Sequence, residues 1–452
     1  VYFFFDQAKE MSLARRATCR GLRMYSSESS QVVRKVFTWG SGWNGRTGHN
    51  SRYIIRSPKH LSYLDSINVK QLAGKSKHML ALSADGRVFA WGCNDWGQLG
   101  IGAEQTSFLG QLYDHHMPME VQGLPKVVQI AAGWSTSAAV DEEGQAWIWG
   151  CNNNGQLTEA CATGFSPTPI KIPGFSKADG VTVKQISLGG DHTALVDSDG
   201  MLWTWGSDDY GRLGHGMKLD ILGTKLATPT KVGYFAGDEG SGREEPLKVK
   251  QVSCGYSHTL VVAATDQVFA FGGNSRNQLG CDTGAHVTKT QQFDCVFTPT
   301  PVPLLAGKVV SNYINSGALD KDGRPMLWGG QFLAPTLVRR TATRPFKSKM
   351  IDVAVGAGHL ATLTDEGRLF LTGSNVFGEL GVGAPWYKRS SRTEPSPITA
   401  LKDYNVLQVI CGNRCTAALV EPRVEEEEEE EVEEEGEEPQ EQQKPEKEEG
   451  KW

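Results

Sequence analysis

The feature that most constrains this 452-residue chain is a short motif, aromatic-x-Trp-Gly, which recurs along most of its length. Seven copies, with substitutions in the last three, end at Gly40, Gly92, Gly150, Gly206, Gly272, Gly329 and Gly373. By the differences of these numbers, successive glycines lie 52, 58, 56, 66, 57 and 44 residues apart. A period near 50 residues with strand-like units predicts a β-propeller, because such units must stack to bury a common core.

One well-formed copy shows what each part of the repeat predicts. Residues 186–196 contain short apolar stretches on both sides of a Gly-Gly bend, which is typical of two antiparallel strands. The sequence Asp-Ser-Asp-Gly at 197–200 predicts a hairpin turn, because Asp-Gly tolerates positive φ. Residues 201–205 alternate bulky and small side chains as a third strand would, and the glycine-rich stretch 206–214 predicts a looped exit. Asp266-Gln267 is a weaker version of the hairpin signal.

These elements together resemble the regulator of chromosome condensation repeat, from about Val36 to Val420. The resemblance implies an all-β fold, a seven-bladed β-propeller with four-stranded blades. The first motif, at 36–48, has no strand pair before it, and the last strand pair, at 407–420, has no motif after it. We therefore expect the N- and C-terminal segments to pair within one blade, which would close the propeller and remove two open sheet edges.

The sixth copy departs furthest from the repeat. Asn312 and Asn315 stand where most other copies have glycine and histidine, and Gln331-Phe332 replaces the usual exit. Such a copy indicates either a surface specialised for a partner or sequence drift, and the sequence does not choose between them.

The charge of the chain is unevenly distributed. The net charge is −6, but residues 421–452 contain 17 Glu against four basic residues, a net −13, which leaves +7 for residues 1–420. The run from Glu425 to Glu431 has no core-forming residue and predicts a disordered acidic tail at 421–452. This tail is interpreted as a solubilising appendage or, alternatively, as a decoy for basic partners or a flap over the basic body.

Residues 11–25 have the composition of a mitochondrial transit peptide. The segment starts at Met11, contains four Arg together with Ser12 and Thr18, is followed by Ser26 and Ser27, and has no acidic residue. We expect cleavage after Tyr25 and interpret residues 26–35 as a linker. Residues 1–10 lack Met, so we interpret them as a non-native upstream segment. The alternatives for the basic segment are an arm that binds nucleic acid or a nuclear importer, and a plastid address.

Two further features bear on the compartment. The nine cysteines include no Cys-x-x-Cys pair, and no Asn-x-Ser/Thr sequon occurs, so a reducing compartment fits better than a secreted disulfide framework. No apolar run approaches the roughly 20 residues of a spanning helix, and we expect no membrane span.

The repeated tryptophans and histidines are expected to be structural. The tryptophans of the motif should pack between blades: Trp39, Trp91, Trp149, Trp205 and Trp328. Four histidines share one repeat position, and each should hydrogen-bond a neighbouring backbone group in its own blade instead of joining a metal site: His78, His192, His258 and His359.

Three other patterns are interpreted as accidental. Gly-x-Gly-x-x-Gly at 40–45 is not followed by the helix that a dinucleotide site requires. Gly74-Lys75-Ser76 ends like a phosphate-binding loop but lacks the earlier glycine, because residue 69 is Val. Asp114-His115-His116, with Glu120 nearby, has metal-capable side chains but no fourth fixed ligand, so we expect a polar loop surface.

The sequence predicts a binding protein, with no catalytic, cofactor-binding or metal-binding residues. No Ser-His-Asp or Cys-His pair has a recognisable context. The family's founding member is a guanine nucleotide exchange factor for the GTPase Ran and also binds nucleosomes. The resemblance therefore implies exchange by differential binding, but we find no insertion like the family's hairpin wedge.

Our first prediction is a monomeric scaffold or assembly factor for an organellar complex, in the mitochondrial matrix or at the matrix face of the inner membrane. The alternatives are an exchange factor for a small GTPase, and a nuclear Ran regulator that binds chromatin. The alternative localisation is nuclear or cytoplasmic. Residues 331–349 are the predicted docking patch for an acidic protein or RNA, and a solvated loop is the alternative. The basic residues of this patch are Arg339, Arg340, Arg344, Lys347 and Lys349.

Overall fold

A computed structural model of the chain describes residues 33–103, 112–216, 224–237, 245–281, 294–330, 332–339, 346, 348–383 and 391–423. The predictions of an upstream segment at 1–10 and a transit peptide at 11–25 therefore lie outside the described residues, as does most of the linker. The predicted acidic tail at 421–452 lies outside them except for residues 421–423, of which Glu421 and Pro422 belong to a β-strand.

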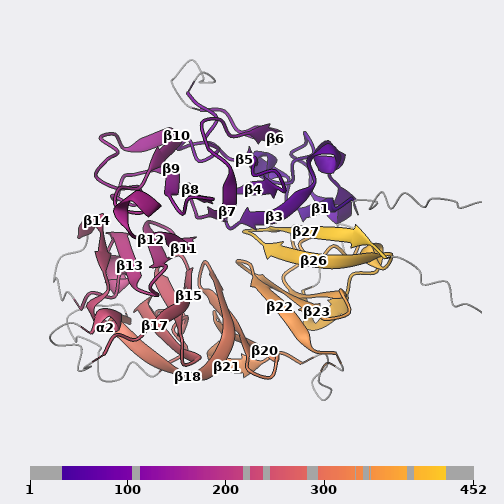
Figure 1. Cartoon of the computed structure of the whole chain (residues 1–452). Coiled ribbons are helices and arrows are strands. Elements are labelled where there is room, and N and C mark those ends of the chain that lie inside the picture. Colours follow the sequence, from indigo (N-terminus) through magenta and orange to yellow (C-terminus); the bar gives the residue numbers. More distant parts are fainter. Residues whose placement is uncertain are drawn as a thin grey trace, which may run out of the picture. The chain divides into compact units, whose positions relative to one another are not determined.

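The regular secondary structure of the described residues consists almost entirely of antiparallel β-strands (Figure 1). The terminal sheet has the order β2-β1-β27-β26, with β2 (Ile55–His60), β1 (Lys35–Gly40), β27 (Cys415–Pro422) and β26 (Tyr404–Cys411). The next sheet contains β3 (Val69–Gly74), β4 (His78–Ser83), β5 (Val88–Gly92) and β6 (His115–Glu120). Two more sheets follow, made of β7 (Val127–Ala132), β8 (Thr136–Asp141), β9 (Ala146–Cys151) and β10 (Phe165–Lys171), and of β11 (Val183–Leu188), β12 (His192–Asp197), β13 (Leu202–Ser207) and β14 (Lys225–Lys231).

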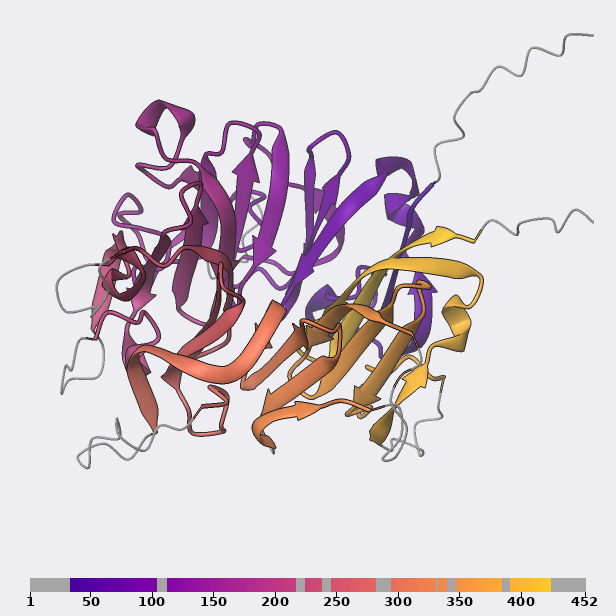
Figure 2. The same cartoon turned by 60° about the horizontal axis from the view of Figure 1, so that its bottom comes forward.

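The following sheet has seven strands because one long strand serves both of its halves. The strands are β15 (Val249–Cys254), β16 (His258–Ala263), β17 (Gln267–Gly273), β18 (Cys295–Asn312), β19 (Asn315–Asp320), β20 (Pro325–Gly329) and β21 (Phe332–Leu337). The first part of β18 pairs with β17 through Leu305, and from Ala306 onward it pairs with β19. Figure 2 shows β18 as a long curved strand in orange. The last sheet contains β22 (Met350–Val355), β23 (His359–Thr364), β24 (Leu369–Gly373) and β25 (Arg392–Pro397).

Helices are few and short among the described residues. Within the described ranges the single α-helix is α2 (Gly233–Ala236), and the 3-10 helices are η1 (Trp43–Gly45), η2 (Ser62–Ile67), η3 (Lys177–Asp179), η4 (Asp209–Gly211) and η5 (Thr399–Leu401). This confirms the predicted all-β class, built from four-stranded antiparallel sheets as in a β-propeller.

The two ends of the described chain meet in the terminal sheet. Strand β1 pairs with β27 in unbroken antiparallel register from Lys35↔Val420 to Gly40↔Cys415. The indigo and yellow strands lie side by side in Figure 1. An N-terminal strand is thus hydrogen-bonded to the last strand of the chain, which covers an edge that each would otherwise expose.

The glycine of the recurring motif has a steric reason. Gly40 has φ +103°, and a Cβ atom there would lie 2.5 Å from the carbonyl oxygen of Arg414 in the neighbouring turn. The register between β1 and β2 shifts at the same point. The strand therefore needs a residue without a side chain where it bends against the turn before β27.

The hydrophobic core is divided into clusters between consecutive sheets. One cluster joins Trp39 and Val409 of the terminal sheet to Leu371 of β24, and the next joins Leu419 to Leu72 of β3. Each later pair of consecutive sheets shares a cluster of the same kind, and within the β15–β21 sheet the cluster lies between its two halves. Each sheet thus buries apolar side chains on both faces.

Candidate protein-interaction site

The five motif tryptophans are fully buried and tie neighbouring sheets together. Each indole N–H donates to the carbonyl oxygen of an exit-loop residue at 2.7–3.0 Å. The exit loop belongs to the preceding sheet or, for Trp328, to the first half of the β15–β21 sheet. The pairs are Trp39 with Glu379, Trp91 with Arg46, Trp149 with Gln98, Trp205 with Gln156, and Trp328 with Gln278. Phe271 occupies this position in β17 and has no indole N–H.

The four repeated histidines lie in four different strands, and each bonds a side chain of the sheet that follows or, for His258, of the second half of the β15–β21 sheet. Each Nε2 lies 2.9–3.0 Å from a side-chain hydroxyl, where the sequence led us to expect a backbone group. The pairs are His78 with Ser137, His192 with Thr259, His258 with Ser316, and His359 with Thr416. The four histidines do not converge on a common point.

The hydrogen bonds of the hydroxyl groups fix the tautomer of these histidines. Thr416 already donates its hydroxyl hydrogen to the carbonyl oxygen of Glu379 at 2.8 Å, so it must accept from Nε2–H of His359. The other three hydroxyls donate to exit-loop carbonyls in the same way. Burial lowers the pKa of His359 and His78 to about 4 and that of His258 to about 3. These rings are therefore neutral at physiological pH.

Turns at one repeat position join the first two strands of each four-stranded unit, and two of these turns have another residue in place of the usual glycine. The last pair before the first of these turns is Gly74↔Met79, and the equivalent pair in the β11–β12 hairpin is Leu188↔Thr193. Lys75 is therefore equivalent to Gly189, the first residue of that turn. By the same comparison of registers, Asn312 takes this place in the turn between β18 and β19. Of these two departures, the sequence analysis named only the one in the sixth copy.

Lys75 and Asn312 link sheets that are far apart in sequence. The ammonium group of Lys75 donates to the carbonyl oxygen of Leu188 at 2.9 Å and to that of Cys254. The side-chain amide of Asn312 donates to the carbonyl oxygens of Lys75 and Cys411, at 3.2 and 2.9 Å. Burial lowers the pKa of Lys75 to about 8. We call these two residues the Lys75–Asn312 cluster.

Three aromatic side chains from the same set of turns form a second cluster, the aromatic trio. Trp134 stacks on Tyr313 with ring centroids 5.6 Å apart and an interplanar angle of 25°, and its edge contacts Tyr256 at 4.9 Å. Tyr256 in turn contacts Tyr313 at 5.8 Å. Tyr313 is exposed and the other two rings are partly exposed. Aromatic rings that cluster at a surface are typical of binding sites.

A pocket of about 380 Å³ lies beside the aromatic trio. Trp134 and Tyr313 form one part of its lining, and Phe377, Glu379 and Arg414 form another. Its residues come from the turns before β8, β19, β23 and β27 and from the exit loop after β24. The pocket therefore exists only because these turns meet, which is why no local sequence motif reports it.

The charged groups of the pocket differ in environment. The guanidinium of Arg414 is exposed and lies 4.5 Å from the ring centroid of Phe377. Glu379 is buried, and one of its carboxylate oxygens accepts from the backbone N–H of Phe377 at 2.8 Å. Burial raises the pKa of Glu379. Three exit loops have Gln at this position, Gln98, Gln156 and Gln278.

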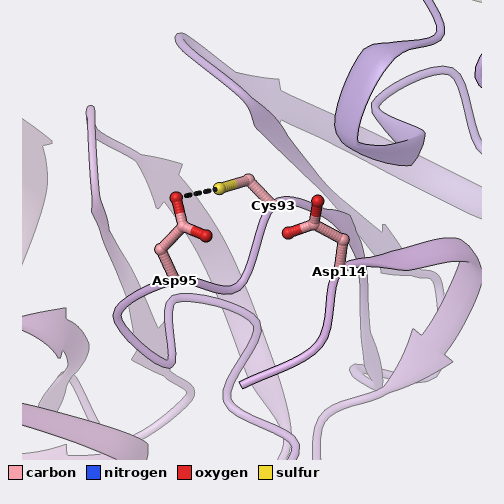
Figure 3. A group of neighbouring side chains, drawn as sticks. All are labelled: Cys93, Asp95 and Asp114. Atoms are coloured by element: carbon pink, nitrogen blue, oxygen red, sulfur yellow. Dashed lines mark hydrogen bonds between the residues drawn. The ribbon is translucent and has the colours of Figure 1, made fainter. Parts of the chain in front are cut away.

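One group of metal-capable side chains occurs among the residues that the structure describes. Cys93, Asp95 and Asp114 bring their ligand atoms within 4.8 Å of one another (Figure 3). The Cys93 thiol donates to Asp95 at 3.1 Å, and burial raises the pKa of Cys93 to about 12, so the thiol is protonated. Asp114 accepts from the Asn44 side chain at 2.7 Å and from the Asn94 backbone at 3.1 Å. These bonds account for the group without a metal ion.

The predicted docking patch is only partly within the described residues. Arg339 and Lys349 are exposed, whereas Arg340, Arg344 and Lys347 lie outside. Lys349 precedes β22, and the pocket turn follows the other end of this strand. The two described members of the patch are therefore not part of the pocket.

The three sequence patterns that were interpreted as accidental lie in turns and strands of the repeat. Gly74-Lys75-Ser76 forms the turn between β3 and β4, with no helix after it. The glycines at 40–45 lead from β1 into η1. His115 and His116 lie in β6, and no metal-capable group among the described residues includes them. No helix in the described part of the chain is long and apolar enough to cross a membrane.

Sequence reasoning missed the pocket, although one signal was available. An alignment of the turns by strand register places Trp134, Tyr256 and Tyr313 directly after the position of the turn glycine, three aromatics at one repeat position. The repeat has no structural need for an aromatic ring there, because Gly190 and Ala357 fill the same position in other turns.

Family models match most of the chain. The model described as the RCC1-like domain matches residues 35–333, and the model described as the regulator of chromosome condensation (RCC1) repeat matches residues 366–419. The Ultraviolet-B receptor UVR8 of Arabidopsis thaliana is 31% identical over 369 residues, which cover 77% of this chain and 74% of UVR8. The human E3 ubiquitin-protein ligase HERC2 is 28% identical over 411 residues, 86% of this chain but only 8% of HERC2.

Solved structures agree with these matches in fold. Yeast RCC1 (Prp20), in its complex with Kap60, superposes with a TM-score of 0.71 at 22% identity, covering 87% of this chain and 90% of that one. Human WBSCR16 superposes with a TM-score of 0.69 at 21% identity, covering 86% and 100%. At these identities the structural likeness reports the fold alone.

Proposed function

The chain belongs to the RCC1-like domain family, and from this premise we propose that it is a closed seven-bladed propeller that acts as a non-catalytic scaffold or assembly factor in mitochondria. The strand orders support this division into blades. The β15–β21 sheet divides at β18 into two four-stranded units, and the terminal sheet combines strands from both ends of the chain. Each of the resulting units shares an apolar cluster with the next.

The observation that carries the binding role is the aromatic trio beside the pocket. Trp134, Tyr256 and Tyr313 are held against one another at a surface and contribute to no sheet core. Exposed clusters of Trp, Tyr and Arg dominate the binding energy of protein interfaces, and Arg414 stands next to them. The family, whose members include interaction and exchange-factor proteins, makes a protein partner the natural ligand.

The mitochondrial part of the proposal is supported by the composition of residues 11–25 alone. A proximity-labelling enzyme fused to the C-terminus tests compartment and partners together. We expect the full chain to label mitochondrial proteins and a chain without residues 11–25 to lose this labelling. Unchanged labelling after the deletion would contradict the address.

The role of the surface is tested by the same experiment with a second variant. Trp134→Ala combined with Tyr313→Ala should keep the compartment but lose a defined subset of labelled neighbours. A set of neighbours that does not change would remove the trio as a docking surface. Acceleration of fluorescent guanine nucleotide release from a candidate GTPase would instead favour the exchange-factor alternative.

The closed ring is tested by removing its last strand pair. Deletion of residues 407–420 removes most of β26 and nearly all of β27, so that β1 keeps only its pairing with β2. We expect loss of cooperative thermal unfolding and a larger hydrodynamic radius. A deleted chain that stays compact and unfolds at the same temperature would exclude closure.

A further inference from the structure

We propose that the pocket beside the aromatic trio is the recognition site for a peptide segment of the partner in which an Asp or Glu is next to a bulky apolar residue. The carboxylate binds Arg414, and the apolar side chain enters between Trp134 and Phe377. This inference rests on the proposed binding function and specifies the chemistry of the partner.

The first reason is that Arg414 has unused hydrogen-bonding capacity. Among the described residues, no carboxylate lies within ion-pair distance of its guanidinium. The guanidinium lies over the face of the Phe377 ring. By contrast, Arg212 lies near Asp191 and donates to the carbonyl oxygen of Asp209. A guanidinium offers five donors in a planar fork that matches a carboxylate, so Arg414 is suited to an acidic ligand.

The second reason is that Arg414 is held on a rigid turn. The buried guanidinium of Arg46 donates to the carbonyl oxygen of Asn413 at 2.5 Å and to that of Trp43 at 2.8 Å. The backbone of Arg414 itself has φ +71°, and its carbonyl oxygen accepts from the backbone N–H of Ser41 at 2.8 Å. A preorganised donor loses less entropy on binding than one on a mobile loop.

The third reason is the size and lining of the pocket. A volume of about 380 Å³ is at the small end of ligand sites, which suits one large side chain and a neighbouring carboxylate. Trp134, Tyr313 and Phe377 supply apolar walls on which an aromatic or branched side chain can pack.

Charge decides between a protein ligand and a nucleic acid. The pocket contains one exposed cation, Arg414, and one buried carboxyl group, Glu379. Binding to a phosphate backbone requires several cations along a track, because its affinity comes from releasing many counterions. A single guanidinium beside apolar walls instead fits one carboxylate next to one apolar side chain.

The test uses the full chain and a synthetic peptide array. Each peptide is a Gly-Ser dodecamer with one central pair, formed from Glu, Asp, Gln or Lys followed by Phe, Leu or Ala. We expect binding to Glu-Phe, Asp-Phe, Glu-Leu and Asp-Leu, and loss of at least about 10-fold in affinity when Gln, Lys or Ala replaces either member. Affinities of the best pairs are then measured by fluorescence anisotropy, beside a labelled oligouridylate of equal length.

Three variants assign the binding to the pocket. Arg414→Asn keeps a residue that tolerates positive φ and should weaken the best peptide at least about 10-fold. Arg414→Lys should retain part of the affinity, and Trp134→Ala should weaken all apolar pairs. The matched control is Arg276→Asn, an exposed arginine in the exit loop after β17, which should leave peptide affinity unchanged.

The outcomes separate this inference from the proposed function. Equal binding of Lys-Phe and Glu-Phe peptides, or an Arg414→Asn variant that binds as the wild type does, would overturn the carboxylate assignment. Oligouridylate binding that depends on Arg414, without peptide binding, would overturn it in favour of RNA. In each case, neighbour labelling that still depends on Trp134 and Tyr313 would leave the scaffold function intact.

Discussion

The indole N–H of Trp39 donates to the carbonyl oxygen of Glu379 at 2.7 Å, although 340 residues separate the two in the sequence. The same carbonyl oxygen also accepts from the hydroxyl of Thr416, in β27. One exit-loop carbonyl therefore joins the first strand of the fold to the last sheet and the last strand.

This relationship predicts the cost of Trp39→Phe. Phe271 shows that phenylalanine fits this repeat position, so the variant loses the hydrogen bond and part of the packing. We expect the free energy of unfolding to fall by about 1–3 kcal/mol. Trp205→Phe, which removes the equivalent bond to Gln156 between sheets adjacent in sequence, is the control and should cost the same. A Trp39→Phe variant as stable as the wild type would show that this contact is absent in solution.

The repeated histidines predict acid sensitivity. The pKa of each buried ring lies below that of the unfolded chain, about 6.5, so below that pH the unfolded state binds more protons than the folded state. Stability should therefore be fully present above pH 6.5 and be lost as the pH falls toward 4. For each ring, the free energy of unfolding should fall by at most about 1.4 kcal/mol per pH unit.

A single substitution tests this acid window. His359→Thr introduces the residue that Thr136 provides at the same position in β8. The variant should be less stable at pH 7, because Thr416 loses a donor. Its stability should nevertheless fall less steeply with pH than that of the wild type, measured by denaturant unfolding at pH 7, 6 and 5. Parallel pH profiles of the two proteins would contradict the assignment.

Glu379→Gln should stabilise the protein at neutral pH. Burial raises the pKa of this carboxyl group above its unfolded value, so the folded state binds more protons in that window and stability falls as the pH rises through it. The equivalent loop has glutamine at this position, Gln98, whose side-chain oxygen accepts the same backbone hydrogen bond without a negative charge. The gain should appear at pH 7–8 and shrink on acidification to pH 4, as followed by denaturant midpoints. A loss of stability at pH 8 would contradict this reasoning.

Lys75→Met should change how stability depends on alkaline pH. With a folded pKa of about 8 and an unfolded value of about 10.4, the unfolded wild-type chain binds the extra proton between these values. Stability of the wild type relative to the variant should therefore rise by at most about 1.4 kcal/mol per pH unit in this window. Lys75→Arg, which stays charged, gives a second reference and should show the same slope. A flat difference with both variants would mean that Lys75 keeps its ordinary ionisation.

Much of the fold could be predicted because its signals are local and repeated. The motif ending at Gly40 and its six counterparts indicate repeated strands, and the family resemblance of the repeat implies four-stranded blades. The all-β class is confirmed, and five of the six sheets among the described residues have four strands. The order of strand pairs and motifs also predicted that residues near 36–40 would pair with residues before Val420, and β1 pairs with β27. The closed seven-bladed ring stays a proposal.

Details of the turns were predicted less well, because a side chain can replace glycine when the surroundings permit it. In the turn at Asp266, Asp itself takes the left-handed conformation with φ +69°, where Gly86 stands in the first hairpin. The sequence comparison had aligned this Asp one position too early. The Lys75–Asn312 cluster and the aromatic trio were missed for a related reason, since both depend on which turns face one another across distant sheets.

The pairing of β1 with β27 also has a consequence for the order of events during synthesis. Strand β1 leaves the ribosome first among the strands, yet its partner emerges about 375 residues later. Until then its edge is open, and Trp39 has no carbonyl to bond. The native pairing of β1 is attainable only after residues 415–420 have been synthesised, so a chaperone has a long interval in which to hold the nascent polypeptide.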